Sequence, residues 1–381
     1  MSPRIARRSR SGGRPYEPAT PIDLLPFIPD ELADELELGT DPAGDAERAG
    51  LKYVTDSMAG IARKRWGRGF VYQTADGKRL TDRTVRERID GLVIPPAWTD
   101  VWICADADGH IQATGRDAEG RKQYIYHPEW ARVRNLAKFN RVIAFGNALP
   151  VIRTRCEKDL RKRGLPYEKV LAAVVFLLDR TLIRVGNQSY AEMNGSFGLT
   201  TLRDRHVNFS GTRCAFEFSG KSGKKHCVEI DDARLARIVR LCRDVPGYDL
   251  FQYYDEDDRR DRIDANDVNR YLREISGKEI SAKDFRTWGG SVHAAVALSD
   301  MDESRSESEA EKQIVRMVKS VAERLGNTPA VCRQYYIHPS IIEAHLEGSF
   351  RETFAEGVTL NSHPQLEQEE TALLHVLCSR L

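Results

Sequence analysis

The segment over residues 167–181, YEKVLAAVVFLLDRT, is the feature that most restricts the fold, because its apolar residues occupy nearly every face of a helix. A helix that is hydrophobic all round must be covered by other elements. We expect it to be the mostly buried helix of a mainly helical domain, ending near Gly186-Asn187. The preceding stretch, residues 133–163, repeats apolar residues at helical spacing and predicts a neighbouring helix.

The chain has 381 residues, which is more than one hydrophobic core usually serves, so we expect two or more domains. Residues 52 to about 130 contain short, β-like runs separated by Asp-Gly turns at Asp76-Gly77 and Asp108-Gly109. Alternation of apolar and polar residues around such turns is typical of antiparallel strands. This part of the chain therefore predicts a small β-sheet domain.

From about residue 131 the pattern is helical, with an insertion of strand-like runs between residues 198 and 232. Helices resume afterwards, and one of them begins with Asp264 as N-cap and Asp267 three residues later. The predicted fold class is α+β, with a small N-terminal antiparallel sheet domain and a larger, mainly α domain that carries a small β insertion.

The two ends of the chain differ in composition from these domains. The first part changes from arginine-rich SPRIARRSRSGGRP to an acidic stretch, which predicts a partly disordered tail. The part from Glu347 onward is mostly polar and contains several glutamates. We therefore divide the chain into a tail (1–50), a sheet domain (51–130), a helical domain (131–346) and a C-terminal polar extension (347–381).

Charge, cysteines and apolar runs exclude several classes of protein. Lys and Arg number 58 and Asp and Glu 57, so the net charge of +1 indicates no particular partner. Seven cysteines without a CxxC pair fit reduced thiols in the cytosol. The N-terminal arginines are not followed by an apolar segment, and no apolar run approaches the roughly 18 residues of a membrane span. We expect a cytoplasmic protein without a membrane partner.

Two motifs resemble cofactor-binding sites but do not meet the requirements of such sites. Gly220-Lys221-Ser222 looks like the end of a phosphate-binding loop, but position 215 is Ala where that motif needs glycine, and the flanking runs are both strand-like. The acidic run over residues 255–261 is typical of a solvated loop, and no zinc-binding spacing is present. We therefore expect no nucleotide, no metal and no other cofactor.

Four separate stretches each place a cation or a hydroxyl group beside turn-forming residues. Arg184 precedes a Val-Gly-Asn turn, Lys221 lies at the tip of a glycine-flanked hairpin, and Arg286 lies on a short capped helix. Tyr335 and Tyr336 follow a Gly-Asn-Thr-Pro turn that begins another helix. Each basic residue taken singly is typical of a solvated surface charge, and paired tyrosines are more often packing residues.

Together these residue types suit phosphoryl transfer to a tyrosine. A phosphodiester resists attack because its charge repels nucleophiles and its alkoxide leaves poorly. Two arginines neutralise the non-bridging oxygens, a lysine protonates the departing oxygen, and a tyrosine oxygen attacks phosphorus. None of these steps requires a metal ion.

The chain resembles the type IB DNA topoisomerases of the small bacterial and poxvirus-like branch over residues 52–346. The resemblance rests on five blocks in the family's order, which are IPPAWTDVWICADADGHIQATGRDAEGRKQYIYHPEW, RVGNQSYAEMNGSFGLTTLRDRHV, FSGKSGKKH, KDFRTWGG and LGNTPAVCRQYYIHP. It implies that Arg184 and Arg286 are the catalytic arginines, Lys221 is the general acid and Tyr336 is the nucleophile. Tyr335, about 100° away on the same helix, should then be the packing tyrosine.

One position departs from the poxvirus pattern. The residue before Thr-Pro is Asn327, where that branch has a histidine. The resemblance implies a catalytic donor at this position, and an asparagine amide can donate a hydrogen bond without carrying a positive charge.

The resemblance also implies a clamp around duplex DNA, formed by the two domains, and relaxation of supercoils through a 3′-phosphotyrosyl intermediate without ATP. Duplex DNA is then the expected partner of a monomeric, nucleoid-associated protein. The expected DNA contacts lie in the basic, aromatic part of the sheet domain. They are Gln112, Arg116, Arg121, Lys122, Gln123, Tyr124 and Tyr126.

Two other functions stay open at this point. Tyrosine recombinases use the same arginine, lysine and tyrosine chemistry, but a helical domain would be expected where this chain has a predicted sheet. A non-catalytic protein that clamps DNA is the alternative from another class. Relaxation of plasmid DNA without Mg²⁺ or ATP would separate these functions.

Overall fold

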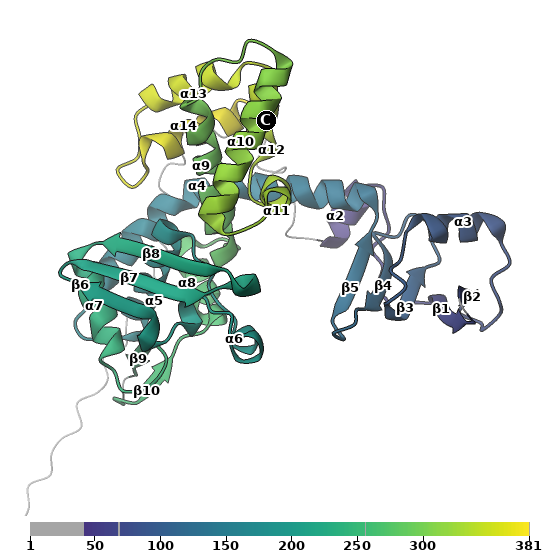
Figure 1. The fold of residues 1–381 in the computed structure, drawn as a ribbon, viewed down its shortest axis with the longest axis horizontal. Coiled ribbons are helices and arrows are strands. Elements are labelled where there is room, and N and C mark those ends of the chain that lie inside the picture. Colours follow the sequence, from purple (N-terminus) through teal and green to yellow (C-terminus); the bar gives the residue numbers. More distant parts are fainter. Residues whose placement is uncertain (1–41, 68, 256, 381) are drawn as a thin grey trace, which may run out of the picture.

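The computed structural model describes residues 42–67, 69–255 and 257–380, and it shows a small sheet domain joined to a larger helical body by one long helix (Figure 1). This arrangement confirms the predicted α+β class. The sheet domain consists of α2 (Pro42–Arg48), β1 (Gly60–Trp66), β2 (Gly69–Gln73), α3 (Arg83–Gly91), β3 (Thr99–Cys104), β4 (Ile111–Arg116) and β5 (Lys122–Tyr126).

The five strands of this domain form an antiparallel sheet in the order β2-β1-β3-β4-β5. Ile61 and Ile103 on the sheet pack with Ile89 of α3, so the helix covers the apolar face. The Asp108-Gly109 turn connects β3 to β4 as predicted. The Asp76-Gly77 turn follows β2 and leads only to an isolated bridge between Gln73 and Arg79.

The helical body begins with α4 and contains two further small sheets. Its helices are α4 (Pro128–Leu160), α5 (Tyr167–Thr181), α6 (Gln188–Asn194), α7 (Ala233–Arg243), α8 (Ala265–Ser276), α9 (Ala282–Ser299), α10 (Glu307–Leu325), α11 (Pro329–Tyr335), α12 (Pro339–Leu346), α13 (Phe350–Thr359) and α14 (Gln368–Cys378). Its strands are β6 (Val207–Ser210), β7 (Arg213–Ser219), β8 (Lys225–Asp231), β9 (Gln252–Tyr254) and β10 (Arg260–Arg262). The sheet β6-β7-β8 is the predicted β insertion.

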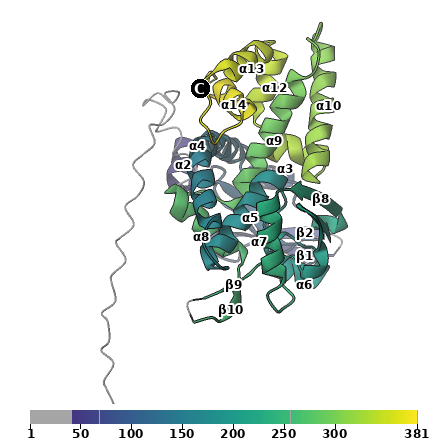
Figure 2. The ribbon, with the colours of Figure 1, turned by 90° about the vertical axis from the view of Figure 1, so that its left-hand side faces the viewer.

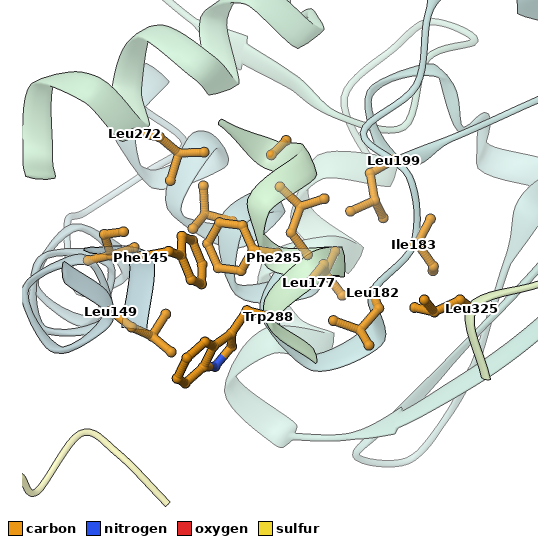
Figure 3. Packing of buried hydrophobic residues seen from close by; sticks show 14 of the residues in the cluster. Phe145, Leu149, Leu177, Leu182, Ile183, Leu199, Leu272, Phe285, Trp288 and Leu325 are labelled. Atoms are coloured by element: carbon orange, nitrogen blue, oxygen red, sulfur yellow. The ribbon is translucent and has the colours of Figure 1, made fainter. Parts of the chain in front are cut away.

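Helix α5 is the buried element that its composition predicts, and α4, α7, α8 and α9 all pack against it (Figure 2). Figure 3 shows Leu177 of α5 among the aromatic side chains of its neighbours. Phe145 of α4 meets Phe285 of α9 edge to face, with ring centroids 4.8 Å apart. Helix α5 ends at Thr181, earlier than expected, because Leu182 adopts a left-handed conformation with φ of 56°.

Both ends of the described chain contain packed helices that composition does not indicate. Most of the tail expected over residues 1–50 lies outside the described residues, but α2 falls within it and buries Ala46 against Trp130. The expected polar extension is wrong as a description of residues 347–381, because α13 and α14 bury Phe350 and Leu373 in the main core. Composition averages over all faces of a helix, so it hides an apolar stripe on a mostly polar segment.

A buried ionic network attaches α14 to the rest of the body. Arg153 of α4 donates to Asp179 of α5 at 2.8 Å and to Glu370 of α14 at 2.7 Å. The indole nitrogen of Trp288, on α9, also donates to Glu370, at 3.0 Å. One carboxylate therefore connects three helices, and its removal would leave the Arg153 guanidinium with a buried, partly unpaired charge.

We predict that Glu370→Ala destabilises the protein by about 3 to 5 kcal/mol, the usual cost of breaking a buried charge pair. The measurement is the free energy of unfolding from urea denaturation. Glu369→Ala, which removes the exposed neighbouring carboxylate, should change stability by no more than about 0.5 kcal/mol. Equal losses in the two variants would contradict the assigned role of Glu370.

The same network predicts a pH dependence. Burial alone would raise the pKa of Glu370, but hydrogen bonds and charge from Arg153 outweigh burial and lower that pKa. A carboxyl with a lowered folded-state pKa stabilises the fold above its unfolded pKa of about 4.3 and loses this contribution as pH falls. The stability difference between the native protein and Glu370→Ala should therefore shrink on acidification.

Candidate active site

Four of the five predicted catalytic residues line one cavity of about 560 Å³. Arg184 follows the end of α5, Lys221 lies in the turn between β7 and β8, Arg286 lies in the first half of α9, and Tyr336 follows α11. Arg121, from the turn between β4 and β5 of the sheet domain, lines the same cavity. The fold therefore brings together residues that are separated by more than a hundred positions in the sequence.

Arg286 is the most deeply buried of these cations, with 4% of its surface exposed. Its two terminal nitrogens donate to the carbonyl oxygens of Leu182 and Leu325, the second at 2.8 Å. These carbonyls lie at the C-terminal ends of α5 and α10, where the helix dipole favours a cation. Burial, together with the charge of Arg184, lowers the pKa of Arg286 to about 10. Its Nε is buried as well, and the Arg286 side chain interacts with the hydroxyl of Tyr336, the predicted nucleophile.

Asn327 joins the cavity residues through Arg184. The Arg184 guanidinium donates to Oδ1 of Asn327, which fixes the orientation of the amide, because a guanidinium has only donors. The opposite atom, Nδ2, is buried, and the Asn327 side chain also interacts with the thiol of Cys332. Burial lowers the pKa of Arg184, so an anion beside this pair would offset the cost of holding its charge.

The Tyr336 ring lies under Arg286, whose guanidinium carbon is 5.2 Å from the ring centroid. Helix α11 ends at Tyr335, so Tyr336 is its C-cap and leaves the helical path with φ of −132°. Two residues of α9 hold this backbone. Ser291 Oγ donates to the Tyr336 carbonyl at 3.5 Å, and a Cβ at Gly290 would lie 2.6 Å from that same oxygen.

Tyr335 is not the packing residue that helical geometry predicts, because 41% of its surface is exposed. A separation of about 100° between the two side chains requires both tyrosines to lie on one helix. The helix instead ends between them, and it is Tyr336 whose ring packs against the main core. Helical periodicity therefore does not relate the two side chains.

Lys221 lies at the exposed tip of the β7–β8 hairpin, as the glycine pattern predicts. The tip is closed by hydrogen bonds from Gly220 N to Lys224 O at 2.7 Å and from Gly223 N to Gly220 O at 3.1 Å. Gly223 has φ of +69°, a conformation that side chains disfavour. Lys283, three residues before Arg286 on α9, also lines the cavity, and helical spacing from Arg286 would have indicated it.

Gln112, expected among the DNA contacts, lies inside the sheet domain with 3% of its surface exposed. Its oxygen accepts from Arg88 at 2.6 Å, and its nitrogen donates to the carbonyls of Ala107 and Gly109, both at 2.7 Å. This expectation is therefore wrong, because the side chain is used to hold the β3–β4 turn. Alternation along a strand does not reveal which polar side chains the fold covers.

Three of the expected contacts share one exposed face of β5. Lys122, Tyr124 and Tyr126 alternate along the strand, and the two tyrosine rings stack with centroids 5.8 Å apart. Lys122 pairs with Asp56 at 2.6 Å. The face combines flat aromatic surface with a cation, which suits contact with a nucleic-acid backbone or groove.

The remaining expected contacts lie at the β4–β5 turn and are held by acidic neighbours. Arg121 and Gln123 both donate to Asp117, each at 2.8 Å. Arg116 is exposed and lies 3.8 Å from Asp100. Arg116 and Arg121 are exposed, whereas Gln123 is half-buried and the Asp117 carboxylate that it shares with Arg121 is 17% exposed. The two arginines are therefore the more accessible of these groups for a phosphate.

Two family models match the chain. The catalytic core of eukaryotic DNA topoisomerase I matches residues 127–350, and the N-terminal domain of bacterial DNA topoisomerase IB matches residues 69–117. The chain belongs to the type IB DNA topoisomerase family. Among its relatives, the DNA topoisomerase 1B of Acanthamoeba polyphaga mimivirus is 32% identical over 295 residues, covering 76% of this chain and 88% of the relative.

More distant members of the type IB topoisomerase family show the same relationship. DNA topoisomerase 1B of vaccinia virus, strain Copenhagen, is 23% identical over 291 residues, which are 72% of this chain and 90% of the viral protein. DNA topoisomerase 1 of Schizosaccharomyces pombe is 22% identical over 243 residues, which are 63% of this chain and 29% of the yeast protein.

Neither a membrane-spanning helix nor a metal-binding cluster occurs among the described residues. None of their helices combines the length and apolar character needed to cross a lipid bilayer. They also contain no group of three His, Cys, Asp or Glu side chains arranged to hold a metal ion.

We predict that Gly290→Ala lowers the rate of DNA strand cleavage about 100-fold, because the added methyl displaces the Tyr336 backbone and small misplacements have effects of this size. Single-turnover cleavage of a duplex oligonucleotide measures the rate, and DNA affinity should change little. Gly91→Ala, which adds a methyl in open space on α3, is the control and should cleave normally. A normal rate for Gly290→Ala would show that α9 does not position Tyr336.

Proposed function

We propose that the chain relaxes supercoiled duplex DNA by cutting one strand with Tyr336, letting the cut strand swivel, and resealing it. The observation that carries this proposal is the convergence of two guanidinium groups, the buried Arg286 and the half-buried Arg184, on a cavity that is also lined by Tyr336. The family to which the chain belongs, named for DNA topoisomerases, supports the same reaction.

In cleavage, the Tyr336 hydroxyl releases its proton to solvent as its oxygen attacks phosphorus. A bond forms between that oxygen and phosphorus, and the bond from phosphorus to the 5′ oxygen breaks. Arg184 and Arg286 donate to the non-bridging oxygens and stabilise the charge that develops there. Both groups are partly or fully desolvated by the fold, which strengthens their interaction with an anion. The product is a 3′-phosphotyrosyl link and a free 5′-hydroxyl.

Lys221 is proposed as the acid that protonates the departing 5′ oxygen. It lies at a hairpin tip and lines the same cavity as the two arginines and Tyr336. Resealing reverses each step, with the 5′-hydroxyl attacking phosphorus and Tyr336 leaving. One phosphoester replaces another, so the cycle needs no ATP, and torsional strain in the DNA drives the swivelling.

The sheet domain is proposed to hold the duplex against the helical body. The face formed by Lys122, Tyr124 and Tyr126, together with Arg121 at the cavity, provides backbone and groove contacts. The monomeric state, the independence from nucleotide and metal, the absence of a membrane partner and the cytoplasmic, nucleoid-associated location remain predictions.

A plasmid relaxation assay tests this function against the two alternatives. The purified protein should relax negatively supercoiled plasmid in EDTA and without ATP, at sites throughout the plasmid. A tyrosine recombinase would act only at paired target sites, and a non-catalytic clamp would bind without changing linking number. The match of residues 69–117 to a bacterial topoisomerase IB domain disfavours the recombinase.

We predict that Tyr336→Phe abolishes both relaxation and the covalent DNA adduct, because the variant lacks the attacking oxygen, while non-covalent binding persists. Tyr335→Phe is the matched control, and it should retain relaxation and adduct formation because its exposed side chain lies outside the cavity lining. The adduct is detected by denaturing gel after incubation with labelled DNA. An inactive Tyr335→Phe protein together with an active Tyr336→Phe protein would reverse the assignment.

We predict that Asn327→Ala slows single-turnover cleavage by about 10²- to 10³-fold, the usual effect of removing one preorganised donor. Asn327→Asp separates the two functions of the amide. It keeps an oxygen for Arg184 but loses the Nδ2 donor and adds a negative charge, so it should be at least as slow as the alanine variant. A normal cleavage rate in either variant, with unchanged thermal melting, would show that Asn327 only forms the turn and does not take part in cleavage.

A further inference from the structure

His226 of β8 fills the space between two glycines that each precede a proposed catalytic residue. Its ring stacks on Phe218 of β7, with centroids 5.0 Å apart and planes 12° from parallel. A Cβ at Gly220, just before Lys221, would lie 2.6 Å from the ring atoms Cδ2 and Nε2. A Cβ at Gly326, just before Asn327, would lie 2.9 Å from Cε1 of the same ring.

Lys224 makes a second connection between the same two segments. Its ammonium, on the β7–β8 hairpin, donates to the backbone carbonyl of Asn327 at 3.1 Å. Asn327 in turn accepts from Arg184 through its side chain. A continuous set of contacts therefore runs from the hairpin that carries Lys221, through the Gly326-Asn327 turn, to Arg184.

We propose that His226 and Lys224 are positioning residues, which hold the hairpin of Lys221 against the turn of Asn327 so that the acid and the donor face one phosphate. This inference rests on the proposed function, because it assumes that Lys221 is the general acid. Neither residue needs to contact DNA in this role. Each acts through the backbone of the two segments that it joins.

The need for such a link follows from the place of the acid. Lys221 lies at the exposed end of a two-stranded hairpin, and Gly220 and Gly223 on either side of it restrict the backbone least of all residues. A proton donor must lie within hydrogen-bond reach of the leaving oxygen, and a misplacement of about 1 Å can cost about 10²-fold in rate. The His226 ring, which packs between Gly220 and Gly326, prevents the hairpin tip from moving by such a distance.

The chemistry of the ring is compatible with its surroundings. Burial, followed by the charges of Arg184, Arg286 and Lys224, lowers the pKa of His226, so the imidazole is uncharged near neutral pH and does not repel these cations. Its function is to supply a flat surface to two closely approaching backbones. Any aromatic ring that fits the same space should therefore serve.

The test compares cleavage of an ordinary phosphodiester with cleavage of a substrate that has sulfur at the 5′ bridging position. Sulfur leaves as a thiolate without a proton, so loss of general-acid catalysis slows the ordinary substrate selectively. Lys221→Ala provides the reference pattern. His226→Ala should slow the ordinary substrate by about 10- to 100-fold and the sulfur substrate by much less. Lys224→Met should show the same selectivity.

Three further variants distinguish positioning from general loss of structure. His226→Phe should recover most of the rate on the ordinary substrate, because it restores the ring. Gly220→Ala should be slow by itself and should add no further slowing to His226→Ala, because removing the ring removes the clash. Cys227→Ser, at the exposed next position of β8, should cleave both substrates normally. Thermal melts accompany every variant.

The outcomes that overturn the inference differ from those that overturn the proposed function. Equal slowing of both substrates by His226→Ala, or a normal rate for that variant, would show that the link does not position Lys221. Absence of sulfur selectivity in Lys221→Ala, or of any Tyr336 adduct in the native protein, would instead contradict the proposed mechanism. If the native protein forms the adduct and only Lys221→Ala slows the ordinary substrate selectively, the proposed function stands. The positioning role of His226 and Lys224 is then refuted.

Discussion

The arrangement of the proposed active site depends on one buried charge, the guanidinium of Arg286. Removing a cation from water costs several kcal/mol unless acceptors surround it, and here the acceptors are the carbonyls of Leu182 and Leu325 at the ends of two helices. The chain continues from the first carbonyl to Arg184 and from the second to Asn327. The same interaction that satisfies the Arg286 guanidinium therefore holds the segment of Arg184, which lines the cavity, beside the segment of Asn327, which accepts from Arg184.

Glycine makes the close backbone approaches of this site possible. Gly290 lets the Tyr336 carbonyl lie directly against α9, and Gly220 and Gly326 allow the His226 ring between the hairpin and the turn. A side chain at any of the three would lie 2.6 to 2.9 Å from its neighbour, well inside normal contact. Glycine at these points thus allows α9 to approach the Tyr336 backbone, and the β7–β8 hairpin to approach the turn before α11.

The sheet domain and the helical body contribute different parts of the proposed DNA-binding surface. The body contains the buried cations and the tyrosine, whereas the sheet domain presents solvated cations and stacked aromatic rings, connected through α4 (Figure 1). Arg121 lies where the two meet, since it belongs to the sheet domain and lines the cavity of the body. Exposed charges of this kind contribute affinity that depends on salt, while the buried ones are suited to stabilising charge during reaction.

The sequence by itself determined those features that depend on residues close together in the chain. Apolar composition identified the buried helix α5, the cap and proline at Thr328-Pro329 marked the start of α11, and glycines marked the hairpin tip at Lys221. Only the tertiary structure decided that Tyr336 leaves its helix, that Gln112 is covered and that His226 lies between two glycines. These outcomes depend on contacts between segments far apart in the chain, which local periodicity and capping patterns do not encode.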